Sequence, residues 1–532
     1  MKKTLVTTAL LLATITAFAQ TSSKMVFTIE RTIGKMIDTQ EEIKAAEYVF
    51  PERIYDSYID TISKTVTMQL RGMNDNGRWL NRGKIALYDL TDKKIKWTKN
   101  IAYHKNSVEQ FGSTIMFGGL SKHFCLNIET GKNLWKTKNR IRFVDPVTNI
   151  GVGYQLELGH QTDMLEGINL KTGKSIWQRE VNRDYGWNNL FQINDSEWLI
   201  ASAGLHTIDI RNGLGWSYHA ATGEKDYSGT AAANAAGAAL GLLTGTFMFS
   251  TGYNLLWDVV SNVHSDNTGL YLASKERIAR INRDNGIVIW QNLFPADLSS
   301  KSLLFADDSL VYMINYGYAS MNNRQIFYGT PFFAAYDKEN GAQVFFSTIN
   351  ITRNPILGFK IIDDCFLFLF KDRFMKYSLS DGAQILEKTI DNNEFGELRG
   401  FVSSRVYINT ENSSLTSLEL SEVSKKFIIS SNNKVLIIDD ELNIVGDIDA
   451  DQFYIANRRI GDYLFVTKDN KTFILDTDNK KVAEIDMELN PVWIGDKLYS
   501  VRENSFFEID VANLIEQLQS VQNRRRDVMA NF

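Results

Sequence analysis

The chain has 532 residues, a formal net charge of −5 at pH 7 and two cysteines, Cys125 and Cys365. The mild acidic excess argues against a nucleic-acid partner, because proteins that bind nucleic acid concentrate positive charge. Two cysteines exclude a disulfide-rich scaffold; this pair either forms one disulfide or stays as two buried thiols.

The first element in chain order is a secretory signal peptide, residues 1–19. Lys2 and Lys3 form its positive start, residues 5–17 are an apolar run, and Ala17-Phe18-Ala19 is a cleavage signal. We therefore expect an exported, periplasmic protein. No cysteine follows the cleavage site directly, so we expect no lipid anchor there.

A repeated hairpin signature fills the expected propeller domain, residues 20–510. IETGKNLW (residues 128–135) and LKTGKSIW (residues 170–177) share T-G-x-x-x-W, and RDNGIVIW (residues 283–290) gives N-G-x-x-x-W. Glycine after Thr or Asn supplies the positive φ of a tight hairpin turn, and the aromatic residue lies on the outgoing strand. The assigned turn and docking residues are Gly131, Trp135, Gly173, Trp177, Gly223, Tyr227, Gly286, Trp290, Gly341 and Phe345.

The spacing of these turns predicts an all-β fold, a β-propeller. Successive turns lie roughly 40 to 60 residues apart, the length of a four-stranded sheet with its connections. We expect the aromatic rings to wedge between neighbouring sheets. Residues 21–83 are expected to include the strand that closes the ring, and residues 511–532 to form a C-terminal helix or tail.

The repeat resembles the blade of the PQQ-like (pyrroloquinoline-quinone-like) propeller family, whose hallmark is A-x-D-x-x-T-G-x-x-x-W. The sequence from Asn127 to Trp135 and that from Asn169 to Trp177 carry the resemblance most clearly, and it extends over residues 85–483. The resemblance implies a ring of eight blades. Nine hairpin units are counted in the sequence, and a weaker tenth lies near Ile509.

The resemblance implies two classes of function. Quinone-dependent oxidoreductases of the family hold the quinone and calcium over the propeller axis, many with a disulfide between adjacent cysteines; this chain has neither adjacent cysteines nor a C-x-x-C-H haem motif. The other class is a scaffold that resembles a lipoprotein of outer-membrane protein assembly. We expect the scaffold: a non-enzymatic protein without a cofactor, which binds an envelope protein or complex. A periplasmic quinone-dependent oxidoreductase is the alternative.

No metal motif is found in the sequence. The six histidines lack zinc-site spacing. Asp447, Asp449 and Asp451 fall on one face of a strand, but Gln452 and Arg458 replace the glycine and glutamate of a calcium-binding loop. We therefore interpret these aspartates as a solvated strand face or loop.

A Gly/Ala-rich insertion, residues 228–253, interrupts the repeat, and no charged residue occurs from 227 to 257. Gly237, Gly241 and Gly245 recur every four residues, so they share one face of a helix that we expect over residues 230–243. We predict that this face is a contact surface. Three contacts stay open: with the chain's own propeller, with another protein or a second copy, or a peripheral or re-entrant contact of residues 229–257 with a membrane.

Overall fold

The computed structural model describes residues 26–119, 121–157, 160–183, 189–226, 253–267, 269–295, 298–321, 324–351, 353–362, 364–402, 405–407, 427–478, 480–487 and 492–530. The expected signal peptide, residues 1–19, and most of the Gly/Ala-rich insertion lie outside these residues.

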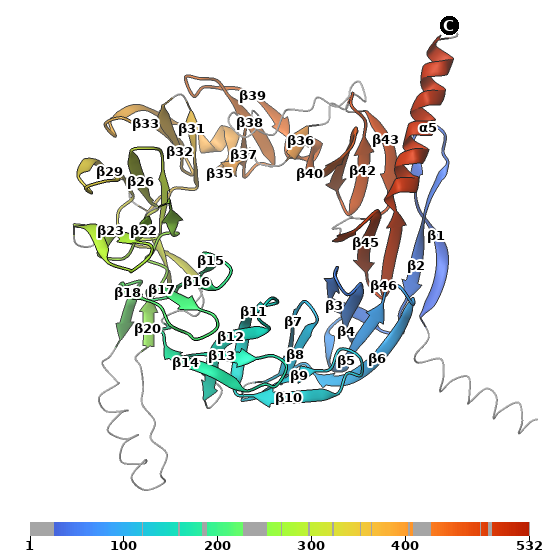
Figure 1. The fold of residues 1–532 in the computed structure, drawn as a ribbon. Helices are drawn as coiled ribbons and strands as arrows, with labels where there is room; N and C mark the ends of the chain where they lie inside the picture. The colour runs from blue at the N-terminus through green and yellow to red at the C-terminus, as the bar shows by residue number, and fades with distance from the viewer. Residues whose placement is uncertain are drawn as a thin grey trace, which may run out of the picture.

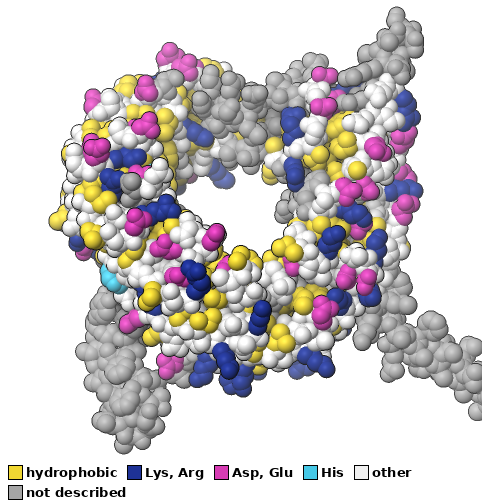
Figure 2. Space-filling model, in the orientation of Figure 1, with side chains coloured by type: hydrophobic (Ala, Val, Ile, Leu, Met, Phe, Trp, Pro, Cys, Tyr) yellow, Lys and Arg dark blue, Asp and Glu magenta, His cyan; other side chains and the backbone are white. Residues whose placement is uncertain are grey.

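Small antiparallel sheets follow one another in chain order around a ring (Figure 1). The ring is open at its centre, as Figure 2 shows. This arrangement is a β-propeller, so the all-β propeller prediction is confirmed. We call each four-stranded unit a blade and number the blades in chain order, beginning with the blade that starts at β3.

Blades 1 to 4 each consist of four consecutive strands. Their strands are, blade by blade, β3 (Arg53–Asp60), β4 (Thr65–Met73), β5 (Trp79–Asp89) and β6 (Lys94–Ala102); β7 (Ser107–Phe111), β8 (Thr114–Gly118), β9 (His123–Leu126) and β10 (Asn133–Thr137); β11 (Asn139–Asp145), β12 (Ile150–Glu157), β13 (His160–Asn169) and β14 (Ser175–Glu180); β15 (Asn189–Gln192), β16 (Glu197–Ala201), β17 (Gly204–Asp209) and β18 (Ser217–His219).

Blades 5 to 8 have the same four-stranded form, and in blades 6 and 8 other elements lie between their strands. Their strands are β21 (His264–Ser265), β22 (Gly269–Ala273), β23 (Arg277–Asn282) and β24 (Val288–Leu293); β25 (Ser302–Ala306), β26 (Leu310–Asn315), β29 (Phe332–Asp337) and β30 (Gln343–Thr348); β31 (Gly358–Ile362), β32 (Cys365–Leu369), β33 (Arg373–Ser378) and β34 (Gln384–Thr389); β35 (Leu398–Phe401), β37 (Phe427–Ser430), β38 (Lys434–Ile438) and β39 (Ile444–Asp449). The short helix α3 (Asn392–Phe395) precedes β35, and the 3-10 turn η2 (Ala450–Gln452) follows β39.

Blades 9 and 10 are joined in one ten-stranded sheet. Blade 9 is β40 to β43, and blade 10 is β44 to β46 with β2. In sheet order the strands are β36 (Arg405–Tyr407), β40 (Phe453–Ile460), β41 (Tyr463–Lys468), β42 (Lys471–Leu475), β43 (Lys481–Ile485), β1 (Phe27–Met36), β2 (Glu42–Val49), β46 (Ser505–Asp510), β45 (Lys497–Arg502) and β44 (Val492–Ile494).

The predicted count of eight blades is not confirmed. Within the described residues, eight four-stranded sheets stand alone, and the ten-stranded sheet contains two further four-stranded groups.

The middle strands of the blades form the core because neighbouring blades cover both of their faces. In β26 and β32 every residue but the first is buried, whereas the outer strand β34 has no buried residue. This explains the near-continuous apolar runs of the middle strands and the alternation of the outer ones.

The N-terminal strand expected to close the ring is β2. It pairs antiparallel with β46 near the C-terminus, with Ala46 opposite Glu508 and Val49 opposite Ser505. The preceding strand β1 pairs with β43 of blade 9. The N-terminal hairpin therefore fastens the last two blades to each other.

Helix α5 (Val511–Ala530) follows β46 directly and begins where the C-terminal helix was expected. Leu514, Leu518 and Val521 are buried and pack on the core between blades 9 and 10. The C-terminal end of the helix projects past the blades (Figure 1).

Candidate functional site

Four of the five predicted turn glycines lie between the third and fourth strands of their blades. Gly131, Gly173, Gly286 and Gly341 have φ angles of 66°, 70°, 72° and 76°. Glycine adopts this left-handed region without strain. In each turn the glycine N–H donates to the carbonyl oxygen of the residue four positions earlier, as from Gly131 to Asn127 at 2.8 Å.

The repeat's aromatic residues pack on the turn glycine of the next blade. Trp135 of blade 2 covers Gly173 of blade 3, since a Cβ built on Gly173 would lie 2.5 Å from Cδ2 of Trp135. The indole N–H of Trp135 donates a 2.7 Å hydrogen bond to the carbonyl oxygen of Leu170. The same packing recurs for Trp97 on Gly131, Trp177 on Gly213, Trp216 on Gly286, Trp290 on Gly341 and Phe345 on Gly382.

These rings lie between neighbouring blades. Trp177 and Trp290 are each 8% exposed and Phe345 is 7% exposed, whereas Trp135 is only half-buried. Each ring joins two blades through apolar contact, and each tryptophan adds a hydrogen bond, so the repeat residues build the ring rather than a ligand site.

The fourth turn lies at Gly213, not at the predicted Gly223. Gly213 lies in the turn between β17 and β18 and has a φ of 74°. Gly223 lies beyond the last strand of blade 4, directly before β19 (Glu224–Asp226). Tyr227, its predicted aromatic partner, lies outside the described residues, and Trp216 is the docking residue of this blade.

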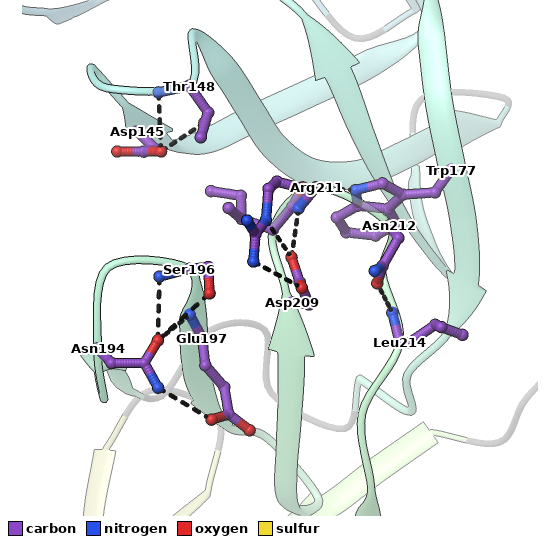
Figure 3. A network of polar contacts seen from close by, with 11 residues as sticks. Asp145, Thr148, Trp177, Asn194, Ser196, Glu197, Asp209, Arg211, Asn212 and Leu214 are labelled. Carbon is purple, nitrogen blue, oxygen red and sulfur yellow. Dashed lines mark hydrogen bonds and ion pairs between the residues drawn. The ribbon is translucent and has the colours of Figure 1, made fainter.

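An Asp or Asn four positions before the glycine distinguishes the fourth turn, at Gly213, from the similar sequence at Gly223. Asp209 precedes Gly213 in this way, and its carboxylate accepts a 2.9 Å hydrogen bond from the backbone N–H of Arg211 (Figure 3). Such a side chain stabilises a turn by standing in for a backbone acceptor. His219, which stands four positions before Gly223, has no carboxylate or amide to do this. This signal would have located the fourth turn from sequence.

Two hairpins, one between blades 4 and 5 and one inside blade 6, join to form what we call the stalk, residues 224–226, 253–259, 318–321 and 324–328. Between blades 4 and 5, β19 pairs with β20 (Tyr253–Leu256). Inside blade 6, β27 (Tyr318–Met321) pairs with β28 (Arg324–Phe327). The two hairpins are joined by a pair of backbone hydrogen bonds between Trp257 and Ser320, of 2.9 and 3.0 Å.

The stalk is fixed to the ring by apolar and charged contacts. Leu256, Val259 and Ala319 are buried together and form a small core of their own. Asp258 pairs with Lys301, which directly precedes β25 of blade 6, at 2.6 Å. The stalk is therefore a structured extension of the ring.

The charge-free segment 227–252 is joined to the stalk at both of its ends. Gly237, Gly241 and Gly245, with the helix expected over residues 230–243, lie outside the described residues. The contact face that they are expected to form therefore stays a prediction.

The aspartates and histidines singled out in the sequence do not form a metal site within the described residues. Asp447 and Asp449 both pair with Lys434, at 3.0 and 2.7 Å, as expected of a solvated strand face. No group of three or more His, Cys, Asp or Glu able to hold a metal ion occurs among the residues that the structure describes. His206 is fully buried in blade 4, and burial lowers its pKa to about 4.

The two cysteines are free thiols in different blades, so they do not form the disulfide that the sequence left open. Cys125 lies in β9 of blade 2 and Cys365 in β32 of blade 7. Burial raises the pKa of the Cys125 thiol to about 12, which makes it inert.

No helix within the described part of the chain is both long and apolar enough to cross a membrane.

A sequence-family profile described as "Outer membrane protein assembly factor BamB" matches residues 81–292. The match confirms the resemblance to the PQQ-like family over these residues. The PQQ-like segment begins in β5 and ends in β24, so it contains the five tryptophans that dock on a turn glycine, Trp97, Trp135, Trp177, Trp216 and Trp290.

The solved structures that are similar to the chain share little sequence with it. BamB from Moraxella catarrhalis is 10% identical with a TM-score of 0.29, over 71% of this chain and 96% of that one. The quinohemoprotein alcohol dehydrogenase ADHIIG from Pseudomonas putida HK5 is 9% identical with a TM-score of 0.28, over 70% and 68%. A eukaryotic initiation factor is 11% identical with a TM-score of 0.32, over 80% and 95%. Among proteins with curated descriptions, none matches the sequence.

Proposed function

We propose that the protein is an exported, periplasmic scaffold that binds a protein or complex of the cell envelope and catalyses no reaction. The observation that carries this proposal is the stalk. One of its hairpins lies between blades 4 and 5 and the other inside blade 6, and neither supplies a strand to a blade. The stalk adds no strand to a blade, yet it is bonded to the ring, so it is suited to present residues 227–252 to a partner.

The composition of the presented segment favours an apolar partner surface. Residues 227–252 contain no charge, and their glycines are spaced for close backbone contact. Apolar surface that a folded protein leaves uncovered marks an interaction site. The match of residues 81–292 to an outer-membrane assembly factor supports an envelope partner.

Replacing residues 227–252 with a short Gly-Ser linker between Asp226 and Tyr253 tests the proposal. The matched control replaces residues 74–78, the turn between β4 and β5, with the same kind of linker. We expect the variant that lacks residues 227–252 to keep the thermal midpoint of the ring and to lose association with crosslinked envelope material. The control should keep both. Aggregation of the deletion, or full retention of envelope association, would contradict the proposal.

The alternative, a quinone-dependent oxidoreductase, is tested on the full chain. Purified protein is mixed with pyrroloquinoline quinone and calcium, and its absorbance and alcohol dehydrogenase activity are measured. The scaffold proposal expects neither a bound-quinone spectrum nor turnover. Saturable quinone binding with turnover would replace it.

A further inference from the structure

A groove of about 930 Å³ lies across blades 1 to 3, away from the stalk. Its walls are the connection from β6 to β7, the connection from β8 to β9, the hairpin of β12 and β13, and the residues that follow β14. The first two walls approach closely, because a Cβ built on Gly119 would lie 2.2 Å from the carbonyl oxygen of Lys105.

The groove is lined by positive side chains in a protein that is acidic overall. No Asp or Glu occurs among the described residues that line it. The basic residues and histidines of the lining are His104, Lys105, Lys122, His123, Arg140, His160 and Arg183.

Acidic residues around the groove neutralise this charge only in part. Glu109 accepts two hydrogen bonds from the Arg140 guanidinium, at 2.7 and 3.2 Å. Asp163 lies near Arg183, and its carboxylate accepts a hydrogen bond from the backbone N–H of Arg183. The Lys105 and Lys122 side chains are exposed.

The Arg183 side chain is held in place, and one of its N–H donors has no acceptor. One of its terminal nitrogens donates to Gln161, and its guanidinium lies 5.7 Å from the centre of the Tyr154 ring. Its Nε is buried without a hydrogen-bond partner. A buried donor of this kind is costly unless something accepts from the group.

Burial also marks the arginines at and beside the groove. Burial lowers the pKa of Arg183 below its usual range, and the charge of Asp163 opposes that shift. Burial, with the charges of Arg140 and Arg183, lowers the pKa of Arg142, and Glu109 opposes that shift. Arginine keeps its charge throughout the ordinary pH range, so Arg183 presents a partly desolvated cation to the groove.

We propose that the groove binds an extended acidic peptide segment of a partner protein. The cationic groups come from loops of three consecutive blades and do not converge from one loop, which suits a chain bearing several carboxylates better than one small anion. Charge complementarity of this kind sets specificity and the rate of association. The site lies apart from the stalk, so it goes beyond the scaffold function proposed above.

The test is binding of a labelled octaglutamate peptide, followed by fluorescence anisotropy at low and moderate salt. The variant Lys105→Glu/Lys122→Glu reverses two exposed charges in the groove. Its matched control is Lys171→Glu/Lys174→Glu, which makes the same change in the exposed turn at the other end of β13. We expect salt-sensitive binding that the groove variant weakens by about tenfold or more and the control by less than about twofold.

Three results would overturn the proposal: no octaglutamate binding by the unchanged protein, equal weakening in the control, or displacement of the peptide by citrate at an equal carboxylate concentration. The last result would mean a site for small anions. The variant that lacks residues 227–252 should bind octaglutamate as well as the full chain does, so failure of this inference and failure of the scaffold proposal are distinguishable.

Discussion

The indole ring of Trp177 occupies the space in which a side chain on Gly213 would lie. A Cβ built on Gly213 would be 2.5 Å from Cε3 of Trp177, and the indole N–H donates a 2.7 Å hydrogen bond to the carbonyl oxygen of Ile210. Figure 3 shows the indole beside this turn, next to Asn212. The Trp177 side chain thus joins blade 3 to blade 4, and it fits because Gly213 has no side chain.

Gly213→Ala should therefore lower the free energy of unfolding by about 2–4 kcal/mol, through backbone strain at positive φ together with overlap on Trp177. Gly77→Ala is the matched control, since Gly77 has a similar φ of 71° but no atom within 4 Å of a built Cβ. The control should lose about 1–2 kcal/mol. Denaturant unfolding of both variants measures the difference, and equal losses would contradict the docking contact.

Trp177→Phe and Trp177→Ala separate the two parts of the same contact. The alanine variant loses the buried ring and should cost about 3–5 kcal/mol. The phenylalanine variant keeps most of the ring but leaves the Ile210 carbonyl without its indole donor, which should cost about 1–3 kcal/mol. Thermal and denaturant unfolding give both values. A phenylalanine variant as unstable as the alanine variant would mean that the hydrogen bond, not the packing, dominates.

The core that helix α5 covers gives a prediction about truncation. A chain that ends at Val521 keeps Leu514, Leu518 and Val521 on that core, so its thermal midpoint should stay nearly unchanged. Among the described contacts it loses the pair of Arg524 with Glu41 and the hydrogen bond of Arg524 to Ser520, which are exposed and worth about 0–1 kcal/mol. A chain that ends at Asp510 uncovers the core and should lose about 6 kcal/mol or more, from roughly 1.5–3 kcal/mol for each of the four buried side chains Val511, Leu514, Leu518 and Val521. Similar midpoints for the two truncations would show that α5 does not stabilise the ring.

His206 gives a prediction about pH. Its ring nitrogens lie 2.9 Å from Ser217 Oγ and 2.9 Å from the Ser202 carbonyl oxygen, and burial lowers its pKa to about 4. Between about pH 6.5 and pH 4 the unfolded chain binds a proton at this residue that the folded chain does not, so stability falls as pH falls through this window. The loss should reach about 2–3 kcal/mol near pH 4.

His206→Gln keeps hydrogen-bonding groups at this position but does not titrate, so it should flatten that part of the pH dependence. Denaturant unfolding from pH 7 to pH 4.5 measures the effect. His104→Gln, at an exposed histidine, controls for the removal of one histidine. An unchanged dependence of the unfolding free energy on pH in His206→Gln would contradict the lowered pKa of His206.

The parts of the fold that depend on neighbours in sequence could be predicted from it. The turn glycines and the aromatic residue four positions later describe a hairpin, and a hairpin is specified by a few consecutive residues. That the ring of Trp135 lies on Gly173, rather than on its own turn, depends on how blades stack. The sequence pattern contains no record of that stacking.

The predicted blade count is not confirmed and the predicted fourth turn is wrong, and the two have related causes. In blades 1 and 8 the turn position with positive φ is taken by Lys93 and Leu442, at 52° and 63°, so a search for glycine weakens there. The resemblance to eight-bladed relatives then outweighed the hairpin count. At Gly223, an Ala-Thr-Gly sequence matched the repeat by chance, without the Asp, Asn or Ser that stands four positions before the observed turn glycines.

Ring closure and the groove are non-local features. Strand β2 pairs with β46 across nearly the whole chain. The groove gathers Lys105, Lys122 and Arg183 from three blades. Each of these residues reads in sequence as an ordinary surface charge, and only the stacking of blades brings them to one surface.

The central claim is that the stalk presents residues 227–252 to a partner outside the ring. Its most direct test is a photoreactive amino acid in place of Leu242, activated in intact cells, with one in place of the exposed Ile62 as the control. We predict that crosslinks from position 242 join this chain to a different envelope protein and that position 62 gives none to that protein. Crosslinks from position 242 only to this chain's own ring, or to a second copy of it, would contradict the account.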